Sequence, residues 1–195
     1  MDKGAYLPAL LRSPKTVYSF ADLALLWNSP TTNATRVRVN YYVTKGALIH
    51  LRKGLYAKDR NYNRLELATK IYLPSYVSFE TVLVKEGVNF QLYGQIFVAT
   101  YCAREISIDR QRFVFRKIKD VVLTNPLGIE NQAQCSVAGV ERALLDTMYL
   151  NTDYHFDNVA SINWEKVFSI LPIYDNKRME RRIRKLHEAC QAGEA

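Results

Sequence analysis

Side chains able to bind nucleic acid are concentrated between residues 33 and 58. Arg36 and Arg38 can each make paired hydrogen bonds to guanine, and Asn40 can make them to adenine. Tyr41 and Thr44 suit contacts to phosphate or to the methyl group of thymine. The full set of candidate DNA-contacting residues is Asn33, Arg36, Arg38, Asn40, Tyr41, Thr44, Lys45, Arg52, Lys53 and Lys58. A set of merely solvated surface groups is the alternative.

The excess positive charge of the chain lies entirely in its first third. The 195 residues carry a formal net charge of +8. Residues 1–64 contain 11 lysines and arginines against three acids, whereas residues 65–195 contain 16 of each sign. A basic head joined to a neutral body is typical of a protein that binds phosphates through one module. An accidental asymmetry of surface charge is the alternative.

Short helices are predicted ahead of this basic segment. Residues 4–12 have the pattern of a short amphipathic helix. Ser19 and Asp22 stand three apart, which is the spacing of a capping box, and they open a second helix that runs to about Trp27. Residues 28–30 then force a turn, because asparagine, serine and proline favour turn conformations.

A third helix is predicted from residue 32 or 33 to residue 45, with Gly46 as its stop. Arg36 and Arg38 flank its exposed face on either side. The residues expected to be buried are Thr35, Val39, Tyr42 and Val43. The residues expected on the opposite face are Asn33, Val37, Asn40, Tyr41 and Thr44.

A β-hairpin is predicted directly after this helix. Apolar and polar residues alternate over 48–58 on both sides of the basic tip at residues 52–54. Gly54 tolerates the positive φ that a tight hairpin turn needs. A capped helix, a turn, a second helix and a basic hairpin within so few residues predict a winged helix-turn-helix over residues 1–60.

The remainder, residues 65–195, is predicted to be an α+β domain with a small antiparallel sheet and flanking helices. Alternating apolar residues over 94–116, with a turn at 109–111, indicate two or three antiparallel strands. Ser78 is expected to cap one of the helices. The helices are expected over residues 65–73, 78–86, 137–150, 164–171 and 176–191.

Catalytic, metal and cofactor sites are not expected. The three cysteines and three histidines are scattered, whereas metal ligands cluster, and three unpaired cysteines suit a reducing cytoplasm. Glu105 and Asp109 lie near two lysines, but the Glu-x-Lys pair of a restriction-type nuclease is absent there. Pairing along a helix explains Glu141, Arg142 and Asp146. We therefore expect a cytoplasmic protein that is not an enzyme, does not insert into a membrane and needs no cofactor.

The last predicted helix carries a run of basic residues at helical spacing. A solvated face and a second phosphate or partner contact are both compatible with that spacing. The residues are Lys177, Arg178, Arg181, Arg182, Arg184 and Lys185.

Four segments, in order along residues 15–150, resemble AbiEi-type antitoxins. Residues 42–57 (YVTKGALIHLRKGLYA) are similar to the end of the recognition helix and the wing of that family. Residues 74–83 (PSYVSFETVL) resemble its Pro-x-Tyr-(Val/Ile)-Ser-x-Glu-(Ser/Thr) segment. Residues 95–100 (QIFVAT) and 141–150 (ERALLDTMYL) are similar to its central strand and its Glu-(Lys/Arg)-Ala-Leu-Leu-Asp helix.

The resemblance implies a type IV toxin–antitoxin system of a bacterium or archaeon. It implies a head that binds an inverted repeat in operator DNA and represses its own operon, as a dimer or as paired monomers. The body would counter a nucleotidyltransferase toxin encoded beside it, often without a stable complex between the two proteins. The alternative is a stand-alone transcriptional regulator whose body senses a ligand or dimerises.

Overall fold

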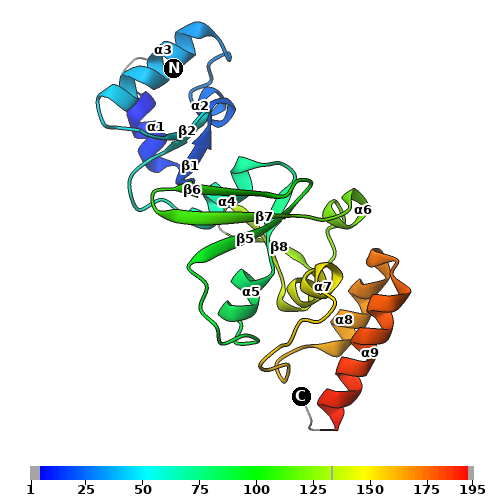
Figure 1. The fold of residues 1–195 in the computed structure, drawn as a ribbon. Coiled ribbons are helices and arrows are strands. Elements are labelled where there is room, and N and C mark those ends of the chain that lie inside the picture. The colour runs from blue at the N-terminus through cyan, green and yellow to red at the C-terminus, as the bar shows by residue number, and fades with distance from the viewer. Residues whose placement is uncertain (1–4, 133, 193–195) are drawn as a thin grey trace. The chain divides into compact units, whose positions relative to one another are not determined.

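The computed structural model describes residues 5–132 and 134–192, which divide into two compact units, residues 1–71 and 72–195 (Figure 1). Helices accompany a three-stranded antiparallel sheet in the first unit and a six-stranded mixed sheet in the second. The α+β class predicted from the sequence is therefore confirmed.

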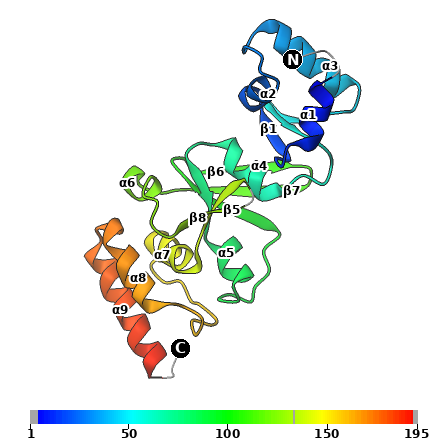
Figure 2. The ribbon, with the colours of Figure 1, turned by 180° about the vertical axis from the view of Figure 1, so that it is seen from behind.

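The helices of the first unit lie close to where the sequence pattern placed them. They are α1 (Tyr6–Arg12), α2 (Phe20–Leu26), α3 (Asn33–Thr44) and α4 (Arg64–Ile71), and Figure 2 shows α1, α2 and α3 from behind. The predicted capping box opens α2. The Asp22 backbone N–H donates to the Ser19 hydroxyl at 3.0 Å, and the Ser19 N–H donates to the Asp22 carboxylate at 2.9 Å. Two otherwise unpaired donors at the helix start are thereby satisfied.

The sheet of the first unit is built on the predicted hairpin. Strands β2 (Ile49–Arg52) and β3 (Leu55–Ala57) pair antiparallel, and Gly54 at φ +78° turns the chain between them. Strand β1 (Val17–Ser19) adds to the other edge of β3, so the order is β1-β3-β2.

Aromatic and aliphatic side chains of α1, α2, α3, β1 and β3 form the core of the first unit, together with Leu48 just before β2. Trp27 is fully buried and its indole N–H donates to the Tyr6 carbonyl at 3.1 Å, which ties α2 to α1. Leu10, Val39 and Leu48 pack in the same cluster. Burial of each such side chain contributes about 1.5–3 kcal/mol. Because Val39 of α3 and Tyr56 of the hairpin belong to the same cluster, the core fixes the helix and the hairpin relative to each other.

Helix α4 is joined to the start of the sheet by a buried carboxylate. Glu66 accepts hydrogen bonds from the Thr16 N–H at 2.8 Å, the Thr16 hydroxyl at 2.7 Å and the Val17 N–H at 3.2 Å. Lys70 of the same helix reaches Asp22 at 3.0 Å, and Lys15 reaches it at 2.8 Å. Any fragment that represents the first unit should therefore extend to residue 71.

The two lysines also shift the pKa of Asp22. Burial alone would raise this pKa, but hydrogen bonds from Lys15, the Ser19 backbone and Lys70 outweigh it and lower the pKa well below the ordinary 3.8. Ionised Asp22 therefore stabilises the fold above its ordinary pKa, and this contribution is lost as pH falls toward the folded-state pKa.

Replacing Asp22 with asparagine should destabilise the protein by about 1–3 kcal/mol at neutral pH, because a helix cap and two charge-assisted hydrogen bonds are weakened. The difference from wild type should shrink between about pH 5 and pH 2. Urea unfolding of both proteins across that range measures it, with exposed Asp59→Asn as the matched control. A constant difference over the whole range would contradict the proposed origin of the stabilisation.

The sheet of the second unit differs from the small antiparallel sheet that the sequence predicts. Its order is β6-β7-β5-β4-β9-β8, and β5 runs parallel to β7, as β4 does to β9. Parallel pairing arises because β6 forms a hairpin with the outer edge of β7, which leaves the other edge of β7 for β5. The strands are β4 (Ser75–Val77), β5 (Gln95–Thr100), β6 (Arg104–Ile108), β7 (Gln111–Lys117), β8 (Ile129–Gln132) and β9 (Cys135–Ala138).

Two helix starts in this unit were predicted wrongly. Residues 135–138 form strand β9, so α7 (Val140–Leu150) begins only after Gly139. Helix α5 (Glu80–Lys85) begins after Phe79, and the Ser78 hydroxyl donates to Asp146 instead of capping the helix. In both places the sheet and a buried partner outcompete the local helical pattern.

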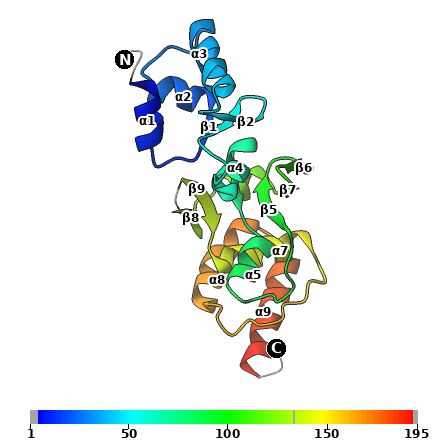
Figure 3. The ribbon, with the colours of Figure 1, turned by 90° about the vertical axis from the view of Figure 1, so that its left-hand side faces the viewer.

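Helices α5 and α7 lie against the sheet of this unit, with α8 (Trp164–Ile170) and α9 (Lys177–Gln191) beyond them (Figure 3). A short 3-10 helix, η1 (Leu171–Tyr174), joins α8 to α9, and α6 (Asp120–Leu123) follows β7. The last helix begins as predicted, with the Asn176 side chain accepting from the backbone N–H groups of Arg178 and Met179.

Candidate nucleic-acid interface

Helix α3 presents the predicted polar face to solvent. Thr35 and Val39 are buried, and the Thr35 hydroxyl is anchored to the Pro30 carbonyl at 2.7 Å. The residues predicted to face outward are all exposed: Asn33, Val37, Asn40, Tyr41 and Thr44. The core thus sets the rotation of the helix about its axis, and five side chains are left free to contact a partner.

A groove of about 380 Å³ lies between α3 and the β2–β3 hairpin. Arg36 and Asn40 line it from the helix, and Lys53 lines it from the hairpin turn. The guanidinium of Arg36 lies 5.4 Å from the centre of the Phe20 ring, which limits its freedom without neutralising its charge. Three of the predicted site residues are therefore brought together around one cationic groove.

Three lining residues of this groove were missed at the sequence level: Phe20, His50 and Tyr56. His50 and Tyr56 are direct cross-strand partners, with ring centroids 5.4 Å apart. Strand register could have paired these two, whereas the contribution of Phe20 depends on how α2 packs.

Arg38 is directed away from the groove. Its guanidinium lies 4.1 Å from the centre of the Tyr6 ring and donates to the Ser29 hydroxyl at 3.0 Å. These contacts attach α3 to α1 and to the turn before it. The structure therefore places Arg36 and Arg38 on opposite sides of α3.

Lys58 has a structural contact as well. Its ammonium donates to the carbonyls of Leu11 and Ser13, at 3.1 and 3.2 Å, at the C-terminal end of α1. Cations stabilise that end of a helix because its last carbonyls lack partners. The structure thus places Lys58 at the end of α1.

The other two cations remain near the predicted interface. Lys45 is exposed after the last turn of α3, with its ammonium 5.9 Å from the centre of the Tyr41 ring. One guanidinium nitrogen of Arg52 is buried and has no hydrogen-bond partner among residues 5–132 and 134–192.

The basic C-terminal helix is divided between structural and solvated positions. Arg182 donates to the carbonyls of Met148, Asn151 and Thr152, at 2.9, 3.1 and 2.6 Å, and so closes the end of α7. The exposed cations of α9 are Lys177, Arg178, Arg181, Arg184 and Lys185.

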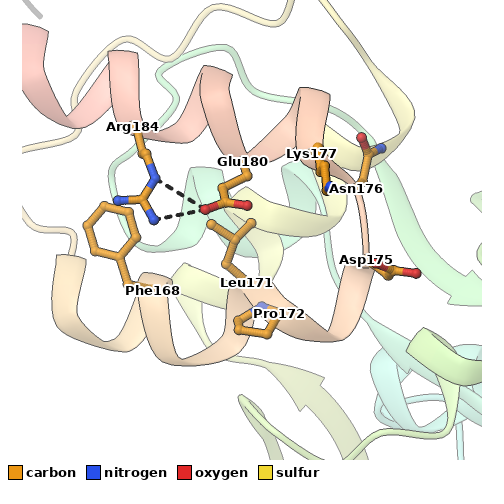
Figure 4. A pocket seen from close by; sticks show the side chains of 8 residues that line it. All are labelled: Phe168, Leu171, Pro172, Asp175, Asn176, Lys177, Glu180 and Arg184. Carbon is orange, nitrogen blue, oxygen red and sulfur yellow. Dashed lines mark hydrogen bonds and ion pairs between the residues drawn. The ribbon is translucent and has the colours of Figure 1, made fainter.

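A second groove, of about 390 Å³, separates η1 from α9 (Figure 4). Arg184 donates to Glu180 at 2.8 Å within it, and Phe168 packs beside that ion pair. Asp175 and Lys177 add one charge of each sign. The groove is therefore polar but close to neutral.

Glu105 and Asp109, the two carboxylates considered as possible metal ligands of a nuclease, lie on an exposed hairpin. Glu105 on β6 pairs with Arg112 on β7, and Asp109 occupies the turn between these strands. Across the described ranges, 5–132 and 134–192, no three histidine, cysteine or acidic side chains are placed to share a metal ion.

Arg142 and Asp146 form a fully buried ion pair at the centre of the second unit, with Nε 3.3 Å from Oδ1. Asp146 also accepts hydrogen bonds from the hydroxyls of Tyr76, Ser78 and Tyr174, at 3.2, 2.7 and 2.6 Å. Burial raises the pKa of both tyrosines, so they remain protonated donors at neutral pH.

Arg142 also donates to the Tyr76 hydroxyl at 3.0 Å and to two backbone carbonyls. It donates to Val122 at 2.7 Å and to Leu127 at 2.8 Å. The predicted pairing along the helix is therefore part of a larger network that joins α7 to β4, η1 and the segment after β7.

Comparisons with known proteins give no assignment. A scan of protein-family models finds no match to the chain, and a search of curated proteins finds none either. None of the helices among residues 5–132 and 134–192 is both long and apolar enough to cross a bilayer.

Proposed function

We propose that residues 1–60 form a winged helix-turn-helix that binds duplex DNA. Helix α3 would be the recognition helix and the β2–β3 hairpin the wing. The observation that carries this proposal is the groove in which Arg36 and Asn40 of α3 meet Lys53 of the hairpin. It lies in the third of the chain that holds all of the excess positive charge.

The geometry is suited to major-groove binding. The major groove admits an α-helix, and α3 exposes both hydrogen-bonding and apolar side chains along one face. Lys53 at the hairpin tip would then contact the neighbouring phosphate backbone. An inverted repeat bound by two copies would multiply the specificity of a single half-site.

On the resemblance described above, we propose that the protein is the antitoxin of a toxin–antitoxin pair and represses its own operon in the cytoplasm. Residues 65–195 would counter a nucleotidyltransferase toxin. If a nucleotidyltransferase gene lies beside the gene for this chain, co-expression of the two tests this role. Growth rescue by the full chain supports the antitoxin, whereas unrelieved growth arrest excludes it.

The second candidate is a regulator without antitoxin activity, whose body binds a small ligand. The groove between η1 and α9 favours it, because four charged side chains line it: Asp175, Lys177, Glu180 and Arg184. A metabolite that raises the melting temperature of wild type but not of Arg184→Ala would support this candidate.

The DNA-binding proposal is tested by gel-shift titration of the full chain. The probes are DNA from its own promoter and a scrambled duplex of equal length, each at two salt concentrations. We expect selective binding to the promoter and a steep loss of affinity with salt, because phosphate contacts release counterions. Equal, salt-insensitive binding of both probes would exclude the proposal.

Replacing Lys53 with alanine should weaken binding to both probes alike. One lost phosphate contact lowers the slope of log affinity against log salt by about 1 per protein copy. Lys119→Ala removes an exposed lysine from the second unit and serves as the matched control. A Lys53 variant that lost selectivity but kept the wild-type salt slope would contradict a backbone contact.

A further inference from the structure

One flank of the exposed face of α3 is apolar. Val37 and Tyr41 lie one helical turn apart and are 68% and 55% exposed. A groove of about 690 Å³ opens beside them. Its remaining lining comes from α1 and α3 and consists of Tyr6, Leu7, Ala34, Arg38 and Tyr42.

Packing within the first unit does not account for this exposure. Thr35 and Val39 already supply the buried stripe of α3, and Val37 points the other way. A large apolar side chain that remains exposed to water does not contribute the favourable free energy of burial to folding. Exposure of two such residues beside a cationic groove indicates a surface that becomes covered when a partner binds.

Hydrogen bonding to bases is weak on this flank. Arg38 is the charged residue that lines the apolar groove, and Tyr6 and Ser29 already hold its guanidinium. On the opposite flank, Arg36 and Asn40 keep their polar groups in the cationic groove. The two flanks of one helix therefore offer different chemistry to a duplex.

We propose that Val37 and Tyr41 recognise the 5-methyl group of thymine in the major groove, an inference that rests on the proposed DNA-binding function. The thymine methyl is the apolar group that base pairs present there. DNA is the favoured occupant because Val37 and Tyr41 directly follow Arg36 and Asn40 in α3, and these two polar residues line the cationic groove. Each half-site should then contain a thymine opposite Val37.

The test uses the full chain and a synthetic pool of random duplexes. Bound sequences are selected and the preferred site is resynthesised with one thymine at a time replaced by deoxyuridine, which removes only the methyl group. We expect one thymine in each half-site at which this change weakens wild-type binding about fourfold, as expected for one buried methyl. Val37→Ala should discriminate less than wild type between the thymine and deoxyuridine forms at that position.

Val121→Ala is the matched control, since Val121 is 75% exposed on α6 of the second unit. It should keep the wild-type response to deoxyuridine, and circular dichroism should show that both variants are folded. Failure to select any sequence would overturn the DNA-binding proposal together with this inference. A selected site at which no thymine responds, or at which Val37→Ala responds like wild type, would overturn this inference alone.

Discussion

Replacing Asp146 with alanine should destabilise residues 72–195 by about 3–5 kcal/mol, because the Arg142 guanidinium is left buried without its counter-charge. The hydroxyls of Tyr76, Ser78 and Tyr174 lose their acceptor in the same step. An unpaired buried polar group costs about 1–3 kcal/mol by itself. Since small domains are stable by only about 5–15 kcal/mol, this loss is a large fraction of the total stability of the unit.

Urea unfolding followed by circular dichroism measures the loss. Glu180→Ala is the matched control, because Glu180 and Arg184 form an ion pair of the same helical spacing whose side chains are 44% and 59% exposed. Exposed pairs contribute about 0–1 kcal/mol, so this variant should stay close to wild type. Similar losses in the free energy of unfolding for the two variants would show that burial of the Arg142–Asp146 pair is not the source of its contribution to stability.

Replacing Arg36 with alanine should abolish most of the preference for promoter DNA. Loss of a bidentate contact to a base costs about 1–3 kcal/mol, which corresponds to about 5- to 150-fold in affinity. The structure supports this expectation for Arg36 because its guanidinium borders the cationic groove together with Asn40 and Lys53. The ratio of dissociation constants for promoter and scrambled duplexes measures the effect.

Arg38→Ala provides the contrast, although the sequence alone assigns both arginines the same role. Arg38 is held by Tyr6 and Ser29. Its loss should therefore lower the stability of the first unit by about 1 kcal/mol and leave the promoter preference within about twofold. Loss of preference in Arg38→Ala with wild-type preference in Arg36→Ala would invert the proposed assignment.

The local sequence pattern correctly predicted those features whose conformation depends on neighbouring residues in the chain. The capping box at Ser19, the stop at Gly46 and the hairpin turn at Gly54 are as predicted, because each depends on a few consecutive residues. The same periodicity predicted the exposed face of α3 and the burial of Thr35 and Val39, whereas Tyr42 and Val43 were predicted to be buried and are half-buried.

The local sequence pattern could not predict which strands pair when they are far apart in the chain. Strand β4 has three residues and is held by β5 and by the distant β9, so its short sequence carries little signal. Residues 137 and 138 were predicted to begin a helix, but they belong to β9, which pairs with β8. The mixed order of the six strands depends on which edges remain free after β6 and β7 have paired.

The sequence by itself determined the α+β class, the concentration of charge in the first third and the set of side chains able to contact DNA. Tertiary structure decided how that set is used. Arg36, Asn40 and Lys53 share a groove, whereas packing against α1 draws Arg38 and Lys58 into structural contacts. The physical reason is that the sequence specifies which charged residues are present, but not which groups surround them. Each long cationic side chain interacts with the acceptors or aromatic rings that the fold places near it.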